Sequence, residues 1–154
     1  MHVGIIMDGN RRYGTQQYGN STKGHVDGAE AAKRVISWCS GKDVPDGYGL
    51  SKNIDVLSMY VFSTQNWNRH RDEVSALMNL FIEYATNEFG NNYDSRETAP
   101  KFRIISTDTR RLPENVISAI QNLEQRTANN QGLQVNLLLS YGAREDIALA
   151  CKAI

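Results

Sequence analysis

Net charge is the first thing that this sequence lacks, because 17 Lys and Arg balance 17 Asp and Glu over 154 residues. Nucleic-acid-binding domains usually carry a basic patch or stripe, so a broad surface of that kind is excluded and any anion site must be local. Cysteine is also scarce. Cys39 and Cys151 lie far apart with no CxxC pair, which excludes a cysteine zinc cluster and favours inert thiols in a reducing compartment.

Long apolar runs are absent as well. No run approaches the length that spans a membrane, and the N-terminus lacks the basic and apolar segments of a secretory signal. The hydrophobic share of 40% and the charged share of 22% are ordinary for a globular protein. We therefore expect one soluble, cytoplasmic domain over residues 1–154. An apolar substrate could bring this domain to a membrane surface.

Strand-like and helix-like patterns alternate along the chain. Four short apolar runs predict strands over 3–7, 54–62, 102–105 and 133–139. Apolar residues at helical spacing predict helices over 22–40 and 71–89, and two more that begin near Pro113 and Arg144. Polar segments containing Gly or Pro predict loops over 41–53 and 91–100. This alternation implies right-handed crossovers, so the expected fold is α/β, a parallel sheet with flanking helices.

The segment after the first strand, Asp8-Gly9-Asn10-Arg11-Arg12, has the strongest functional pattern. We expect a buried strand to deliver an unpaired carboxylate and a tight turn to one edge of the sheet. The carboxylate can hold a divalent cation, the turn can present backbone N–H groups at a helix N-terminus, and the guanidinium groups can clamp anionic oxygens. An ordinary Asp-Gly-Asn turn is the alternative. The pattern favours a site for chemistry on a diphosphate.

Loops that follow parallel strands open on the same edge of a sheet, so the residues after the second strand are expected beside this segment. They are Ser63, Thr64, Gln65, Asn66, Trp67, Asn68 and Arg69. Trp67 either caps the core or forms a wall against an apolar ligand tail, and Tyr13 can do the same. The polar loop 107–111 is interpreted as an ordinary loop, and spacing alone gives His25 a structural role.

Together these segments resemble the cis-prenyltransferase family, typified by undecaprenyl diphosphate synthase. The matching pieces, in family order, are HVGIIMDGNRRY (2–13), GHxxG (24–28), YVFSTQNWNR (60–69), EVSALMNLF (73–81) and NLLLSYGAREDI (136–147). The resemblance implies an undecaprenyl diphosphate synthase-like fold and a Mg²⁺-dependent condensation of isopentenyl diphosphate with an allylic diphosphate, which forms a cis double bond.

The resemblance also implies roles for individual residues. Asp8 is implied to be catalytic and to bind Mg²⁺, while His25 aids diphosphate binding and proton handling. Asn66 is the proton acceptor in the family, but a neutral amide is a poor base, so we expect it to orient the diphosphate that takes the proton. The remaining residues implied to bind substrate are Gly9, Asn10, Arg11, Arg12, Tyr13, Ser63, Thr64, Gln65, Trp67 and Arg69.

Two features depart from the family pattern. Ser21 stands where the family has an arginine, and nearby Lys23 lacks the planar fork of a guanidinium group. The motifs cover about the N-terminal two thirds of the family and omit the later segment that binds isopentenyl diphosphate and completes the Mg²⁺ site. In keeping with this, the last predicted helix has apolar residues up to Ile154 without a cap, so further chain or a partner is expected to pack there.

Three interpretations follow from this coverage. The chain is a piece of a full synthase, or a short form completed by a complementing subunit or a homodimer, or a non-catalytic prenyl-diphosphate-binding or regulatory subunit. Non-catalytic subunits of the family lose the Asp-Gly-Asn segment and keep the later motif, which is the reverse of this sequence. The resemblance therefore favours a chain of the catalytic type.

Overall fold

Four parallel strands form one sheet, in the order β1-β2-β4-β3. The strands are β1 (His2–Ile6), β2 (Val56–Ser63), β3 (Lys101–Ile105) and β4 (Gln134–Tyr141). Each lies within two residues of its predicted bounds, and the parallel sheet confirms the expected α/β fold. The computed structural model describes residues 1–44, 54–89, 91 and 95–153. Parts of the predicted loops lie outside the described residues, namely 45–53 and 92–94. The same holds for Gly90, at the end of a predicted helix.

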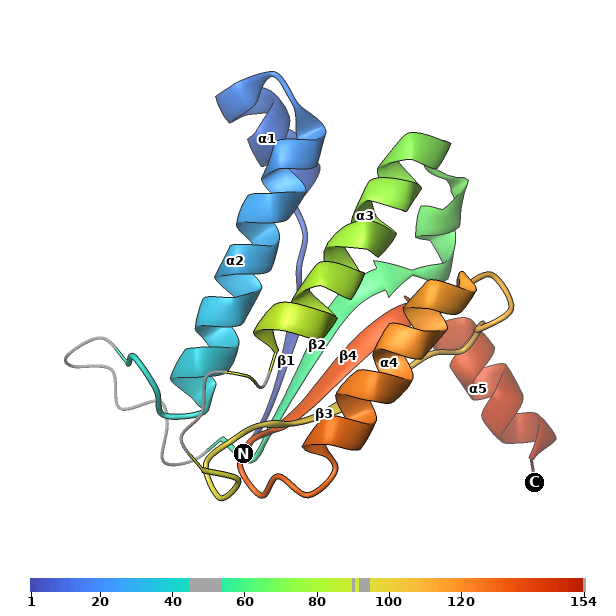
Figure 1. The fold of residues 1–154 in the computed structure, drawn as a ribbon. Helices are drawn as coiled ribbons and strands as arrows, with labels where there is room; N and C mark the ends of the chain where they lie inside the picture. Colours follow the sequence, from blue (N-terminus) through green and yellow to red (C-terminus); the bar gives the residue numbers. More distant parts are fainter. Residues whose placement is uncertain (45–53, 90, 92–94, 154) are drawn as a thin grey trace.

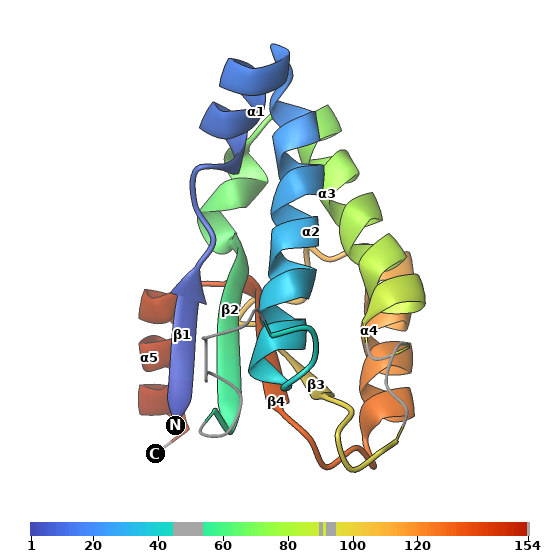
Figure 2. The same ribbon diagram turned by 90° about the vertical axis from the view of Figure 1, so that its left-hand side faces the viewer.

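Three helices cover one face of the sheet, and a fourth lies on the opposite side (Figures 1 and 2). The covering helices are α2 (Ser21–Cys39), α3 (Arg71–Glu83) and α4 (Glu114–Thr127), and the helix on the opposite side is α5 (Ala143–Lys152). Between the sheet and its cover lies the core, where Leu57, Met59 and Leu137 of the central strands are almost fully buried. Burying each such side chain contributes about 1.5–3 kcal/mol, so this layer holds the sheet to its helices.

The first strand is not buried as predicted. Because β1 lies at the edge of the sheet, it pairs on one side only, and Val3 and Ile5 alone pack toward the helical layer. Ile6 points to the other face and is 77% exposed. An apolar run of this length is compatible with either an edge or a central strand, so the sequence pattern does not decide between them.

A short helix, α1 (Asn10–Tyr18), precedes α2 and was not predicted as a separate element. Only Gly14 of α1 is buried, so no apolar stripe signals the helix in the sequence. Gly19 ends it in a left-handed conformation, with φ of 63°. The two helices pack backbone to backbone, since a Cβ at Gly24 would lie 2.0 Å from the carbonyl oxygen of Asn10.

The predicted helix 71–89 is two elements. The α-helix α3 ends at Glu83 and continues as a π-helical turn, η3 (Tyr84–Glu88). From α4, Arg126 donates hydrogen bonds to the carbonyl oxygens of Ala85 and Phe89, which satisfies groups left open where the helix changes pitch. This contact fixes the end of α3 against α4.

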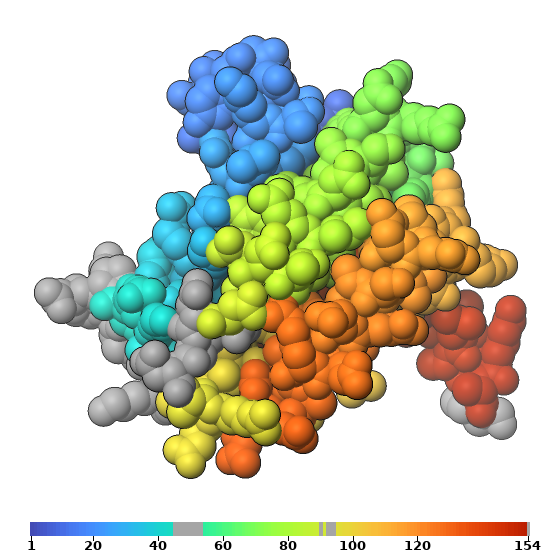
Figure 3. Space-filling model, in the orientation of Figure 1, coloured from blue at the N-terminus to red at the C-terminus, as the bar shows by residue number. Residues whose placement is uncertain are grey.

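Every described residue of α5 is exposed, including Ile147 and Leu149. In Figure 3 the helix stands at the margin of the molecule, apart from the packed body formed by α2, α3 and α4. No helix in the described part of the chain is both long and apolar enough to cross a membrane.

Candidate functional site: an anion-binding edge on an apolar cavity

A cavity of about 270 Å³ lies between the sheet and the helices α2 and α3. Its polar lining comes from the carboxyl ends of β1 and β2 and the elements that follow them: Asp8, Gly9, Asn10, Arg11, His25, Ser63, Asn66 and Arg69. Its apolar lining includes Ala32, Ile36, Met59, Phe62, Leu77, Leu80, Phe81 and Leu137. The cavity therefore joins a cationic, hydrogen-bonding rim to an apolar interior, a shape that suits a ligand with an anionic head and an apolar tail.

The far end of the cavity contains Tyr84 and Phe89, which bracket the π-helical turn. The hydroxyl group of Tyr84 donates a hydrogen bond to Glu30 at 2.5 Å. This bond holds the pKa of the Glu30 carboxyl below its usual value, and burial raises the pKa of the Tyr84 phenol. Tyr84 and Phe89, whose ring centroids lie 5.8 Å apart, thus give this part of the interior an aromatic lining.

Gly9 starts the anion-binding edge by turning the chain from β1 into α1. Its φ of 96° lies in the left-handed region that favours glycine, and its carbonyl oxygen accepts the first helical hydrogen bond, from the N–H of Tyr13 at 2.9 Å. The N–H groups of residues 10–12 therefore have no acceptor within the helix. They form the kind of helix N-terminus that binds phosphate groups.

Asp8 precedes this turn with its side chain 81% exposed. The sequence pattern predicted an unpaired carboxylate, but the Asp8 carboxylate has two partners. Its Oδ1 accepts the N–H of Gly9 at 2.6 Å, and its Oδ2 lies 3.2 Å from Nη2 of Arg12, one turn of helix away. Arg12 is thus directed at Asp8 and does not line the cavity, and Tyr13 beside it packs against Tyr18.

The glycines at 24 and 28 bring α2 close to this turn. Gly24 accommodates the backbone of α1, and a Cβ at Gly28 would lie 2.5 Å from Nδ2 of Asn10. Between them His25 is buried, with 8% of its surface exposed, and its ring faces α3. The spacing of the GHxxG segment therefore follows from packing, which places the imidazole at the cavity.

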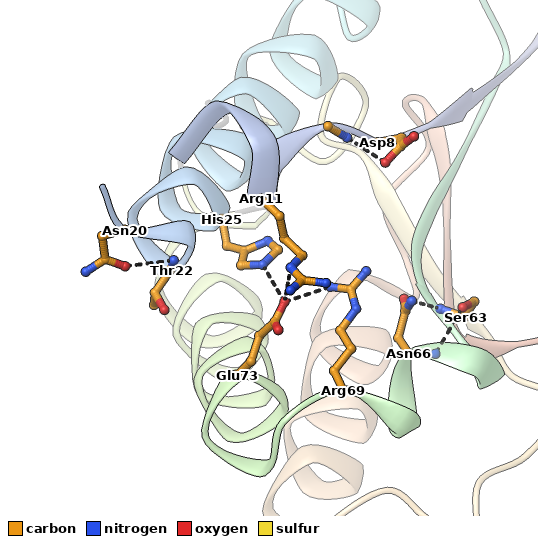
Figure 4. Close-up of polar contacts among 10 residues, drawn as sticks. Asp8, Arg11, Asn20, Thr22, His25, Ser63, Asn66, Arg69 and Glu73 are labelled. Carbon is orange, nitrogen blue, oxygen red and sulfur yellow. Dashed lines mark hydrogen bonds and ion pairs between the residues drawn. The ribbon is translucent and has the colours of Figure 1, made fainter. Parts of the chain in front are cut away.

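Glu73, which had no predicted role, joins the polar groups of the rim (Figure 4). Its Oε1 lies 3.2 Å from Nε2 of His25 and 3.1 Å from Nη1 of Arg69. The same oxygen lies 3.3 Å from Nε of Arg11. The four-residue spacing of Arg69 and Glu73 is visible in the sequence. However, acidic residues are common in the first turn of a helix, where they stabilise the helix N-terminus, so this spacing does not by itself indicate a site.

Ser63 and Asn66 form a reciprocal capping box at the start of the short 3₁₀-helix η2 (Thr64–Asn68). The N–H of Ser63 donates to Oδ1 of Asn66 at 2.9 Å, and the N–H of Asn66 donates to Oγ of Ser63 at 3.2 Å. Asn66 lines the cavity, and because its side-chain oxygen is bonded to Ser63, its NH₂ group is the donor that remains available. The geometry suits a group that orients an anion.

Trp67, Thr64 and Gln65 are not among the described residues that line the cavity. The Trp67 ring packs edge-on against Phe62, and its Nε1–H donates to Oγ of Ser140 at 2.8 Å. The Arg111 guanidinium lies over the same ring. Of its two predicted roles, the structure thus gives Trp67 that of a cap on the core, which ties η2 to the end of β4.

A Mg²⁺ site made by the protein alone is not formed among the described residues, where no three His, Cys, Asp or Glu side chains gather to hold a metal ion. Asp8 is the only carboxylate among the described residues that line the cavity. Mg²⁺ usually takes one or two carboxylates together with substrate phosphates and water. The exposed Asp8 carboxylate, beside the open N–H groups at the start of α1, fits a Mg²⁺ ion shared with a diphosphate.

Comparison with known proteins shows the family of the chain. The prenyltransferase family model, undecaprenyl diphosphate synthase, matches residues 6–154. An isoprenyl transferase of Clostridium acetobutylicum is 38% identical over 154 residues, which cover 99% of this chain and 54% of the relative. A tritrans,polycis-undecaprenyl-diphosphate synthase (geranylgeranyl-diphosphate specific) of Halobacterium salinarum is 35% identical over 99% of this chain and 47% of its own length.

Among solved structures, the crystal structure of lavandulyl diphosphate synthase from Lavandula x intermedia, in complex with dimethylallyl diphosphate, aligns with a TM-score of 0.86. It is 31% identical and covers 99% of this chain and 59% of the plant protein. The chain spans about half the length of the curated relatives it matches, rather than the two thirds that its motifs suggest. Since the family model matches nearly the whole chain, the chain belongs to the undecaprenyl diphosphate synthase family of cis-prenyltransferases.

Proposed function

We propose that residues 1–154 form one domain, which supplies the allylic-diphosphate half of a cis-prenyltransferase active site. The observation that carries this proposal is the cavity, whose rim offers helix N–H groups and two arginines and whose interior is apolar. An allylic diphosphate has this distribution of charge and apolar surface. The reaction is the condensation of an allylic diphosphate with isopentenyl diphosphate to a Z-polyprenyl diphosphate.

The difficult step is the loss of diphosphate from the allylic carbon, whose C–O electron pair leaves with the oxygen. The N–H groups of α1 and the guanidinium groups of Arg11 and Arg69 stabilise the negative charge that grows on the departing oxygens. Asp8 would hold Mg²⁺, which, when bound, adds positive charge at the same place. Arg12 keeps the Asp8 carboxylate in position through its ion pair.

A new C–C bond then forms to isopentenyl diphosphate, which loses a proton to complete the double bond. Asn66, through its NH₂ group, and His25 orient the diphosphate that accepts this proton. Of the other residues implied by the family resemblance, the rim contains Gly9, Asn10 and Ser63, while the adjoining elements α1 and η2 contain Tyr13, Thr64, Gln65 and Trp67. The isopentenyl diphosphate half-site is supplied by a longer polypeptide or by a complementing subunit, either a second copy or a different chain.

We also propose that the protein is cytoplasmic and that it reaches a membrane through its lipid product. We propose no nucleic-acid ligand for it. The alternative function is a non-catalytic prenyl-diphosphate-binding subunit. Both functions need the allylic half-site, and they differ in whether a completed assembly makes product.

Radiolabelled isopentenyl diphosphate, farnesyl or dimethylallyl diphosphate and Mg²⁺ test the proposal, with calorimetry of the allylic diphosphate in parallel. We expect the 154-residue chain to bind the allylic diphosphate and to form little or no product. Robust chain elongation by the chain alone would overturn the assignment to half of a site. Failure to bind any allylic diphosphate would overturn the proposed function itself.

A further inference from the structure

Glu73 lies where three elements meet behind the rim of the cavity. It belongs to the first turn of α3, while the groups on its Oε1 come from α1 (Arg11), α2 (His25) and the residue that follows η2 (Arg69). Its side chain is only 11% exposed. Arg11, His25 and Arg69 line the cavity and Glu73 does not, so the carboxylate stands behind the groups that face a ligand.

The way in which the arginines bind Glu73 leaves donors for that ligand. Arg11 uses its Nε, and Arg69 uses one terminal nitrogen. Within the part of the chain that the structure describes, the terminal nitrogens of Arg11 have no protein acceptor. A guanidinium group held by one nitrogen and open at the others can bind an anion in bidentate fashion.

Two effects of the Glu73 carboxylate on anion binding oppose each other. Its negative charge lies close to the site, and Coulomb repulsion alone would weaken the binding of a diphosphate. Its contacts, however, restrict two long side chains that otherwise lose rotamer freedom when a ligand binds, and a preorganised site binds more tightly. The sign of the net effect tells which one dominates.

We propose that Glu73 is a positioning residue, which directs Arg11, Arg69 and His25 together at the diphosphate of the allylic substrate. This inference rests on the proposed function. Burial favours positioning, since the Glu73 side chain is only 11% exposed and one of its oxygens lies within 3.3 Å of nitrogens from three separate elements, whereas a group that served only to cap α3 needs none of them. Through this one oxygen the three elements present a single anion-binding surface.

Inorganic pyrophosphate with Mg²⁺ is the probe, and calorimetry gives its Kd for the chain and three variants. Glu73→Gln removes the charge and keeps the size, whereas Glu73→Asp keeps the charge and shortens the reach. Asp72→Asn is the matched control, because it removes the same charge from the same helical turn at a side chain that is 92% exposed. We expect both Glu73 variants to weaken binding roughly 10- to 100-fold, the usual loss when a supporting residue is removed, and Asp72→Asn to change it little.

The opposite pattern overturns the proposal. If Glu73→Gln binds pyrophosphate as tightly as the unchanged chain or more tightly, and Glu73→Asp matches the unchanged chain, Glu73 acts only through its charge. Thermal unfolding of each variant shows whether it is folded. If Glu73→Gln does not fold, the Kd of Glu73→Asp tests the proposal. If the unchanged chain fails to bind pyrophosphate, the proposed function itself is wrong. That result is distinct from a failure of the proposal for Glu73.

A double-mutant cycle separates positioning from a general structural role. Arg11→Ala removes one of the groups that Glu73 is proposed to direct. We expect Glu73→Gln to weaken binding clearly less in the Arg11→Ala background than in the unchanged chain, because coupled residues are non-additive. Equal losses of affinity in both backgrounds would mean that Glu73 does not act through Arg11, and would overturn the proposal for that residue.

Discussion

At the scale of single residues, the site depends on which polar groups are already satisfied by the protein. Asn66 has its carbonyl oxygen bonded within the capping box, so its remaining group is a donor. Asp8 is held by the N–H of Gly9 and by Arg12 but stays open to solvent. The two residues follow neighbouring strands in the sequence, yet we propose that Asn66 binds an anion and that Asp8 binds a cation.

Asp8→Asn should remove the part of pyrophosphate binding that depends on Mg²⁺. The amide is a poor ligand for a hard cation, while the N–H groups of α1 remain in place. We expect the stimulation of binding by Mg²⁺, measured by calorimetry with and without the ion, to fall to near zero. The melting temperature should change little, because an exposed ion pair contributes only about 0–1 kcal/mol.

Asp55→Asn is the control for that experiment. Asp55 is likewise exposed, and it pairs with the N-terminal amine at the opposite end of the sheet from Asp8. Its replacement should leave the response to Mg²⁺ intact. An Asp8→Asn chain that still responds fully to Mg²⁺ would remove Asp8 from the metal site.

The residues at the rim of the cavity could be predicted from the sequence better than the residues that hold the rim in place. Asp8, Gly9 and Arg11 follow a strand pattern directly, so their place at the sheet edge could be inferred from spacing. Glu73 could not be found in this way, because its contacts come from residues that are distant in sequence and meet only in the fold. The place of Trp67 was equally undecided, since its partner Ser140 lies 73 residues further along the chain.

At the scale of elements, the site depends on the close approach of α1 and α2. The sequence gives little sign of α1, because its surface is polar and its one buried residue is a glycine. The glycines of α2 give the signal instead, since Gly24 and Gly28 each lack a side chain at a point where α1 lies against α2. Contact between two helix backbones is a tertiary fact, which periodicity within one helix does not reveal.

Gly24→Ala should disrupt this contact. The added Cβ would lie 2.0 Å from a backbone oxygen of Asn10, which cannot move away as the end of a flexible side chain can. We expect the free energy of unfolding to fall by about 1–3 kcal/mol, the usual range for overpacking. Pyrophosphate binding should weaken as well, because the N-terminus of α1 is displaced from Arg69.

Gly4→Ala is the matched control for the packing of α1 on α2, since nothing lies within 4 Å of a Cβ at Gly4. Chemical denaturation should give a free energy of unfolding within about 0.5 kcal/mol of the unchanged chain, as for most substitutions at open positions. If both glycine variants unfold like the unchanged chain, α1 does not pack on α2 as closely as the structure shows.

At the scale of the whole molecule, one cavity connects groups from most elements between β1 and η3, together with Leu137 of β4. The parallel direction of the strands could be predicted from alternating strand and helix patterns. The exposed edge strand and the exposed helix α5 could not, because apolar residues in both follow the same patterns as buried ones. Burial depends on what covers an element, and the local pattern records only that one face is apolar.

The connection between the rim and the apolar interior makes a final prediction. Farnesyl diphosphate should bind at least about tenfold more tightly than pyrophosphate, because each buried methylene group contributes about 0.8 kcal/mol. Ala32→Phe places a ring in the interior and should remove this advantage without changing the Kd of pyrophosphate. Ala148→Phe, on exposed α5, is the control and should change neither value. Calorimetry of both ligands gives the comparison. If Ala32→Phe weakened both ligands equally, the apolar interior would not hold the tail, and the anionic rim alone would account for binding.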